Sequence, residues 1–480
     1  MCWIDSRRNH RTTERAKEQR VAGLRRRKVE PTAPEPENIQ CSEIKESVMT
    51  RQWIQKTVAL GAAAAILLTA STAWGEWGEG VQGGPFTLHP GVSLSAGFDS
   101  NIYYASERES TNLHQAPEGL VEPSLTINTT NPGAFNLGLD ASVAWRQFFS
   151  NQEFVRGQSG LSAELDASIA WNEDGPFSLQ LSENFVRSNE TPNYASAQAI
   201  NRIFNRAGIQ AGLHPGGRIL ETYLSYDFSF YRHSRLTDLD RHTHHFGWNG
   251  HWAFLPKTAI VAEADYRMIR YDEAVRGGDR AVTPRLRNVN SNPLRLMGGV
   301  RGLLTPRITI GLRGGYGWGF YDDGPTFQDW LARAELSYQF GNVEYDNRLR
   351  VGYERDFRDS VISNFYTSHR AVAGYEQGFV ANRLRLELEV DAQIRNYSET
   401  GIGSVQTESA EIIYPEQFSD LLLGVSAGTR FEIRNGWDVG VRYGFRSNFT
   451  EDEIQVVGVG EDSVRDYQRH HLMLSTQLRY

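Results

Sequence analysis

The segment from residue 134 to 145, AFNLGLDASVAW, alternates apolar and polar residues with a period of two. Phe135, Leu137 and Leu139 belong to the apolar set, whereas Gly138 and Asp140 belong to the other set. Successive side chains of a strand point to opposite faces, so this pattern predicts a β-strand between an apolar and an aqueous environment. The segment is about twice as long as an average strand of five or six residues, and this length requires its own explanation.

The alternating pattern recurs from residue 86 to the end of the chain, in segments joined by connections of two kinds. Short connections rich in Gly, Pro, Asn and Asp, such as NEDG and RNG, predict tight turns. They alternate with longer connections, such as 98–118 and 398–417. Short turns at one end and long loops at the other predict an all-β, up-and-down antiparallel β-barrel of about 18 strands, with 16 as the alternative. The predicted strands cover residues 86–97, 119–128, 134–148, 158–172, 176–188, 203–213, 219–232, 243–254, 258–271, 293–304, 307–320, 328–340, 343–357, 365–378, 381–397, 418–432, 436–449 and 466–480.

A transmembrane barrel explains both the length of the strands and the charges on one of their faces. In lipid no backbone N–H or C=O can stay unpaired, so a closed barrel is the only strand-built structure that spans a membrane. Each of its strands needs about 9–11 residues. Residues 383–395, RLRLELEVDAQIR, place Leu, Val, Ala and Ile on one face and Arg, Glu, Asp and Gln on the other. No apolar run after the N-terminal region reaches the roughly 20 residues of a spanning helix. A soluble sandwich would have shorter strands, and the chain lacks the repeat of about 40 to 50 residues that a propeller would show.

Two segments precede the predicted barrel. Residues 1–48 contain 11 Lys+Arg and 8 Asp+Glu without any periodicity. We interpret them as an extension in front of a true start at Met49, or alternatively as a disordered basic tail. Residues 49–75 carry two basic residues, an apolar stretch and an Ala-Trp-Gly cleavage signal, which is the layout of a secretory signal peptide. We therefore expect residues 76–480 to form the outer-membrane β-barrel, with short periplasmic turns and long extracellular loops.

Cysteine content and charge agree with export to the outer membrane of a Gram-negative bacterium. Both cysteines, Cys2 and Cys41, lie in the extension, so the expected mature chain contains neither a disulfide nor a thiolate metal site. Residues 76–480 contain 37 basic and 50 acidic residues. An acidic exported chain is a poor ligand for nucleic acid, so we expect no nucleic-acid partner.

Sixteen charged residues on the polar faces of the predicted strands are candidates for lining a pore. Opposed rows of positive and negative charge would order water and select polar solutes. Alternatively, neighbouring charges pair with one another and brace the wall. The connection Asp272–Asn292, which contains four arginines, either folds inward as a constriction or lies outside as a surface loop. The candidates are Asp140, Arg146, Glu164, Asp166, Arg313, Arg333, Glu335, Arg348, Arg350, Arg385, Glu387, Glu389, Asp391, Arg395, Arg442 and Arg446.

The last strand carries a candidate assembly signal. Leu472, Leu474, Thr476, Leu478 and the terminal Tyr480 share one parity. A final strand with apolar alternate residues and a terminal aromatic resembles the signal that is read by the outer-membrane barrel assembly machinery. We therefore expect this machinery as a partner, together with outer-membrane lipid and lipopolysaccharide.

The first predicted strand and its exit, PGVSLSAGFDSNIYYAS from Pro90 to Ser106, contain a G-F-D-S-N pattern. In this it resembles the opening strand of the β-barrel porins found in Gram-negative exopolysaccharide-export and surface-protein-sorting loci. The resemblance implies a passive outer-membrane conduit for a polysaccharide. The chain lacks a periplasmic helical-repeat scaffold, so delivery of such a substrate would require separate periplasmic polysaccharide export proteins.

We predict a passive outer-membrane channel for hydrophilic solutes, and specifically an exopolysaccharide export conduit. The alternative is a non-conducting structural or adhesive barrel that binds through its extracellular loops, and a barrel-embedded hydrolase ranks below it. The chain contains one Gly-x-Ser-x-Gly pattern, GVSAG at 424–428, but this pattern lies inside the predicted strand 418–432 and not at the strand-to-helix turn that exposes a nucleophilic serine. The histidines at 242–245 and 470–471 fall at strand ends, which favours rim positions over metal ligation. We therefore expect no enzyme activity, no cofactor, no catalytic residue and no metal.

Overall fold

A computed structural model describes most of the chain beyond residue 77, and all structural statements below concern the described residues. These belong to the second of the two units into which the chain divides, Val58–Tyr480. The predicted extension, the signal peptide and the boundary at residue 75 lie outside them, as does most of the loop between Asp272 and Asn292. The described residues are 78–106, 113–131, 133–190, 201–215, 219–234, 237–272, 289–341, 345, 347–360, 363–398, 404–406, 411–413, 417–450, 455–457 and 466–480.

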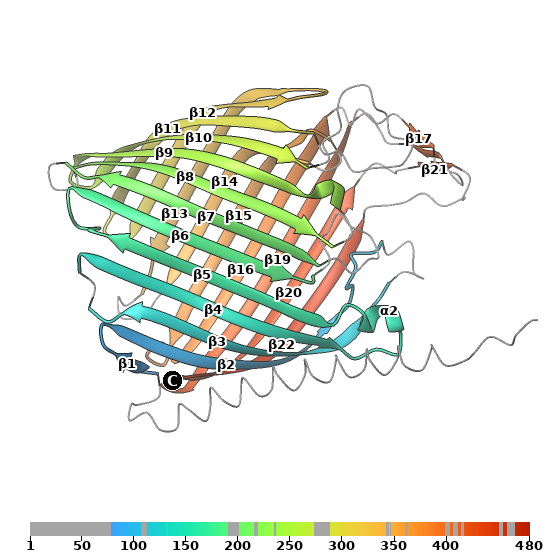
Figure 1. Cartoon of the computed structure of the whole chain (residues 1–480), viewed down its shortest axis with the longest axis horizontal. Helices are drawn as coiled ribbons and strands as arrows, with labels where there is room; N and C mark the ends of the chain where they lie inside the picture. Colours follow the sequence, from blue (N-terminus) through green and yellow to red (C-terminus); the bar gives the residue numbers. More distant parts are fainter. Residues whose placement is uncertain are drawn as a thin grey trace, which may run out of the picture. The chain divides into compact units, whose positions relative to one another are not determined.

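Eighteen strands form one closed antiparallel barrel (Figure 1). Each strand pairs with the next along the chain, and the last one, β22, pairs with the first one, β2. A three-residue strand, β1 (Val81–Gly83), adds to the start of β2. The barrel strands are β2 (Phe86–Asp99), β3 (Ala116–Thr129), β4 (Phe135–Phe148), β5 (Gly160–Trp171), β6 (Phe177–Ser188), β7 (Arg202–Leu213), β8 (Leu220–His233), β9 (Arg241–Leu255), β10 (Thr258–Tyr271), β11 (Ser291–Thr305), β12 (Ile308–Tyr321), β13 (Phe327–Gln339), β14 (Arg348–Asp359), β15 (Phe365–Phe379), β16 (Leu384–Ser398), β19 (Gln417–Arg434), β20 (Trp437–Thr450) and β22 (Tyr467–Arg479).

The predicted fold class and strand number are confirmed, with two local differences. The prediction joined β13 and β14 by the dipeptide GN, but β14 begins only at Arg348, because the N–H of Phe340 bonds the carbonyl of Asn347 and closes a longer turn. Within the long connections, three short strands form a separate sheet, β17 (Ser404–Gln406), β18 (Glu411–Ile413) and β21 (Gln455–Val457). The sequence analysis did not predict these strands, because three residues are too few to show the alternation of apolar and polar side chains. The remaining elements are a short helix, α2 (Glu153–Arg156), and a 3-10 turn, η2 (Thr237–Leu239).

The register of the strands divides the wall into two faces, and the charged face is the inner one. On this face, side chains contact one another across an intervening strand. Arg313 of β12 reaches Glu263 of β10 at 3.1 Å, and Arg395 of β16 donates to the Asn448 side chain of β20 at 2.9 Å. Only the concave face of a curved sheet brings alternate strands together in this way, so the charged face lines the barrel.

The outer face carries large apolar side chains that are open to the surroundings. Leu304 and Leu474 are 65% and 59% exposed. Exposed aromatic residues, among them Trp171 at the short-turn end and Phe320 at the long-loop end, flank the aliphatic ones. Some polar groups on this face bond each other, as Trp248 does when it donates to Thr222 at 2.8 Å. No helix in the described part of the chain is long and apolar enough to cross a membrane. A closed antiparallel barrel with an apolar exterior and aromatic girdles is the architecture of bacterial outer-membrane proteins.

The G-F-D-S-N segment joins the first strand to the last strand at the long-loop end. The carboxylate of Asp99, which is 1% exposed, forms an ion pair with the guanidinium of Arg469, with Nη2–Oδ2 and Nε–Oδ1 distances of 2.5 and 3.0 Å. A Cβ atom on Gly97 would lie 2.2 Å from the Met473 sulfur and 2.3 Å from the Leu472 carbonyl oxygen. Only glycine therefore allows β2 and β22 to approach this closely.

Ser100 and Asn101 complete this junction. The Ser100 N–H donates to the carbonyl of His470 at 2.9 Å, and the His470 N–H donates to the Ser100 hydroxyl at 2.7 Å. The Asn101 amide donates to the carbonyl oxygens of Gln468 and Ala105 at 3.0 and 2.8 Å. The motif on which the resemblance rests therefore closes the barrel in this protein.

Candidate channel and its charged lining

All sixteen predicted pore-lining residues share the inner face by register. Six of them form ion pairs, which supports the interpretation that neighbouring charges brace the wall. Examples are Arg333 with Glu354 at 3.1 Å and Arg395 with Asp420 at 3.2 Å. The six are Arg146, Arg313, Arg333, Arg350, Asp391 and Arg395.

The other ten predicted residues form no ion pair with a residue that the structure describes. Asp140 and Asp166 lie directly opposite one another, and each accepts a 2.5 Å hydrogen bond from a neutral donor, Thr126 and Asn184 respectively. The inner face thus combines neutralised charges with charges that remain open to the lumen, and the role of these residues in lining a pore stays a prediction. The ten are Asp140, Glu164, Asp166, Glu335, Arg348, Arg385, Glu387, Glu389, Arg442 and Arg446.

Two hollows open on the inner face in the short-turn half of the barrel. The first has a volume of about 330 Å³ and the second about 440 Å³. Glycines contribute to the first hollow, because Gly352 and Gly374 leave the inner face without side chains there. The first is lined by residues that include Arg301, Thr309, Glu335, Arg350 and Glu389, and the second by residues that include His89, Thr126, Asn128, Arg385, Arg430 and Arg479.

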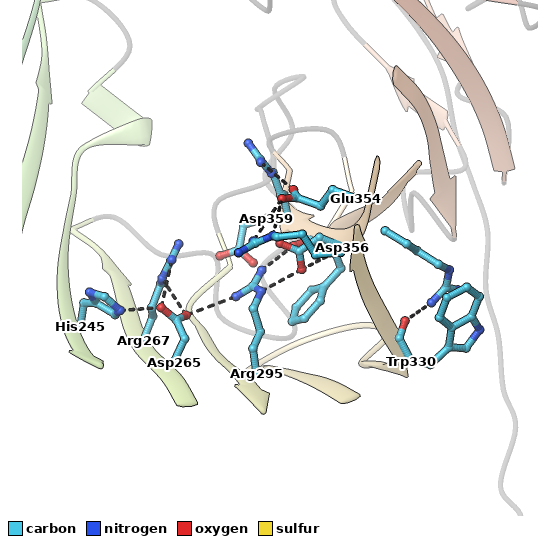
Figure 2. A network of polar contacts seen from close by, with 12 residues as sticks. His245, Asp265, Arg267, Arg295, Trp330, Glu354, Asp356 and Asp359 are labelled. Carbon is cyan, nitrogen blue, oxygen red and sulfur yellow. Dashed lines mark hydrogen bonds and ion pairs between the residues drawn. The ribbon is translucent and has the colours of Figure 1, made fainter. Parts of the chain in front are cut away.

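A network of charged residues crosses the inner face at the long-loop end, from β9 to β14 (Figure 2). His245 contacts the carboxylates of Asp227 and Asp265 at 2.8 and 2.5 Å. Arg295 lies 3.6 Å from Asp265 and donates to Asp356 at 2.8 Å. The contact between Arg295 and Asp356 joins β11 to β14, which are separated in the sheet by β12 and β13.

This contact is possible because the long-loop end of β14 leaves its neighbour β13. Hydrogen-bonded pairing between β13 and β14 stops at Ala332 and Arg355, whereas β14 stays paired with β15 as far as Asp359. Beyond this point Ser291 donates to Asp359 at 2.6 Å. The end of β14 therefore lies over the inner faces of β12 and β13.

An apolar cluster fills the space between the end of β14 and the strands below it. Phe357 is fully buried, and its ring stacks on that of Phe327 at 4.0 Å. Leu331 packs in the same cluster. A Cβ atom on Gly317 would lie 2.7 Å from the Phe357 ring. This packing narrows the lumen at the long-loop end. The sequence analysis missed it, although glycine at three successive inner positions of β12, 315, 317 and 319, is a signal that another segment approaches closely.

A second apolar cluster lies at the long-loop end, where residues that follow β2 pack against the long-loop ends of β3 and β4 and against α2. It contains Ile102, Tyr103, Ala116, Phe148 and Val155. Tyr103 stacks on Phe154 with a centroid distance of 4.5 Å. Burial raises the pKa of Tyr103 to about 12, so its hydroxyl stays protonated and donates to the Phe154 carbonyl at 3.1 Å. Burial of apolar side chains therefore fixes these loop residues in place, as it fixes the residues of a protein core.

The histidines near the strand ends divide between the two faces. His242 and His244 share the outer face, where the hydroxyl of Tyr226 is 2.9 Å from Nδ1 of His244. His245 and His471 lie on the inner face. Among the described residues, no group of three or more His, Cys, Asp or Glu side chains is arranged to hold a metal ion.

The residues of the predicted assembly signal lie in β22 and at its end. Leu472, Leu474, Thr476 and Leu478 are on the outer face by register with β2. The Tyr480 N–H donates to the Pro90 carbonyl at 3.0 Å. Their recognition by the assembly machinery stays a prediction.

Of the comparisons with known proteins, only the one with solved structures gives matches, and three of the matched structures are described below. No protein-family model matches the chain, and no curated protein matches it either. A crystal structure of Pseudomonas aeruginosa OpdK with vanillate is 11% identical with a TM-score of 0.42, covering 82% of this chain and 99% of that one. Acinetobacter baumannii OccAB3 is 10% identical with a TM-score of 0.43 and the same coverage. A mutant of the ferric enterobactin receptor PfeA from P. aeruginosa is 9% identical with a TM-score of 0.44, covering 82% of this chain and 80% of that one.

Proposed function

We propose that this protein is a passive outer-membrane channel for hydrophilic solutes, and that it serves as an export conduit for an exopolysaccharide. The observation that carries the channel function is the concave inner face, on which charged residues such as Glu387 and Glu389 remain unpaired among the described residues and on which hollows of about 330 and 440 Å³ open. Barrels of 16 to 18 strands enclose an aqueous lumen unless another segment fills it.

The export role draws its support from two features. The larger hollow opens at the short-turn end, which is periplasmic in bacterial outer-membrane barrels, so a solute coming from the periplasm meets it first. The G-F-D-S-N segment resembles the opening strand of porins from exopolysaccharide-export loci. Periplasmic export proteins would deliver the polymer, and no step of the transport calls for a catalytic residue, a cofactor or a metal.

A structural or adhesive barrel is the second candidate. It is favoured by the packing at the long-loop end, where Phe357 and Tyr103 are buried in apolar clusters. The three-stranded sheet β17–β18–β21 also gives the long connections a structure of their own, and ordered loops suit the binding of a partner.

Planar-bilayer recording with the refolded chain tests the two candidates. A channel is expected to give stable single-channel currents, and a long anionic polysaccharide such as polygalacturonate, added on the short-turn side, is expected to block them more strongly than its monosaccharide. Blockade by both to the same extent would argue against a polymer conduit. An absence of current from folded, heat-modifiable protein would remove the channel proposal and leave the adhesive barrel.

A further inference from the structure

Two arginines at the short-turn end of the lumen face one another without a carboxylate between them. Arg385 of β16 and Arg430 of β19 are direct cross-strand partners on the inner face. Like charges directly opposite one another destabilise an antiparallel pair. Neither guanidinium has an acidic group within 4.0 Å among the residues that the structure describes, and both side chains are exposed to the lumen.

A second arginine pair in the same barrel shows how such a repulsion is otherwise relieved. Arg313 and Arg333 are also direct cross-strand partners on the inner face. Each is neutralised by its own carboxylate, Arg313 by Glu263 and Arg333 by Glu354, both at 3.1 Å. Each guanidinium of this second pair has a carboxylate partner, whereas Arg385 and Arg430 have none among the described residues. Arg385 and Arg430 therefore lack a negative charge between them.

The surroundings of this pair form a cavity that can hold such a charge. The cavity of about 440 Å³ is lined by both arginines and by the neutral donors Thr126 and Asn128. It also contains Arg479, which is paired with Asp438 at 3.0 Å. Glu432 lines it as well. The lining therefore holds three arginines and two carboxylates, those of Glu432 and Asp438.

We infer that Arg385 and Arg430 form a binding site for an anionic group, a carboxylate or a phosphate, at the short-turn entrance of the lumen. Guanidinium groups bind both oxyanions through two parallel N–H donors. An anion between the two side chains would replace the absent carboxylate and remove their repulsion. The site specifies the solute of the channel as anionic, and it therefore rests on the proposed function.

Binding of small anions to the detergent-solubilised full chain tests this site directly. Sodium phosphate and sodium glucuronate serve as separate probes in isothermal titration calorimetry at low ionic strength, and a preference for one identifies the group. The double variant R385Q/R430Q is expected to bind the preferred anion at least about tenfold more weakly, because it loses charge-assisted hydrogen bonds. The control is R442Q/R446Q, which removes the same charge from lumenal arginines outside the cavity and is expected to bind like the wild type.

Thermal unfolding gives a readout that is independent of transport. Without phosphate or glucuronate, R430Q is expected to unfold at the same temperature as the wild type or above it, since the substitution removes a like-charge contact. Addition of the anion is expected to raise the unfolding temperature of the wild type and of R442Q/R446Q, but not that of R385Q/R430Q.

Equal binding by R385Q/R430Q and the wild type, equal losses in both double variants, or binding of neither probe to the wild type would overturn the site. These outcomes are separable from a failure of the channel function. A barrel that conducts no current but loses anion affinity only in R385Q/R430Q retains the site and loses the channel.

Discussion

Replacement of Asp99 by Ala is expected to lower the free energy of unfolding by about 3–5 kcal/mol, the usual cost of breaking a buried ion pair by removing one partner. The Asp99 side chain is 1% exposed and that of Arg469 is 16% exposed, so the orphaned guanidinium stays largely out of water. The pair joins the first strand to the last, where no covalent connection between the two strands holds the barrel closed. Urea unfolding of the protein in lipid vesicles, followed by tryptophan fluorescence, measures the loss.

Two further variants identify the cause of this loss. Removal of both partners in D99A/R469A is expected to cost less than D99A alone, because no buried charge is left unpaired. The matched control is E376A, which breaks the ion pair between Glu376 and Arg350, whose side chains are 32% and 52% exposed. Exposed pairs contribute about 0–1 kcal/mol. If D99A proves no less stable than E376A, the assigned role of this pair in closing the barrel is wrong.

Replacement of Phe357 by Ala is expected to have a comparable effect on stability and an additional effect on conductance. Truncation of a buried Phe costs about 3–5 kcal/mol, and Phe357 is fully buried against Phe327 and Leu331. The ring also fixes the end of β14 over the inner face of β12. We therefore expect its loss to release this segment and to raise the single-channel conductance, as measured in planar bilayers next to urea unfolding.

The control for this prediction is Phe320→Ala, since Phe320 lies on the outer face and is 50% exposed. This substitution removes contact with lipid and is expected to leave the conductance unchanged. G317V tests the same contact from the opposite side, because its Cβ would lie 2.7 Å from the Phe357 ring and overpacking costs about 1–3 kcal/mol. Wild-type conductance in both F357A and G317V would mean that the end of β14 does not narrow the lumen.

The wall of the barrel could be predicted from the sequence because its determinants are local. A period of two in segments such as AFNLGLDASVAW fixes which side chains share a face, and turn residues such as Asn435-Gly436 fix where a strand ends. Gly436 indeed adopts a φ of +75°, which other residues rarely do. The face on which each side chain lies and the length of each connection together determine an up-and-down barrel. The strand number and the division of the wall into an apolar face and a charged face therefore followed from the sequence alone.

The partners of the charged side chains could not be predicted, because register between strands depends on the whole closed sheet. The sequence treats Arg313 and Arg385 alike, as inward arginines. The register gives each an opposing arginine, but curvature brings Glu263 within 3.1 Å of Arg313 across an intervening strand, whereas Arg385 has no such neighbour among the described residues. Likewise, the departure of β14 from β13 follows from contacts between Phe357 and residues that are distant in the chain. The sequence by itself therefore determined a two-faced closed barrel, since alternation and turns act within a few residues. Only the tertiary structure decided which charges are neutralised and where the lumen narrows, since both depend on distances across a curved wall.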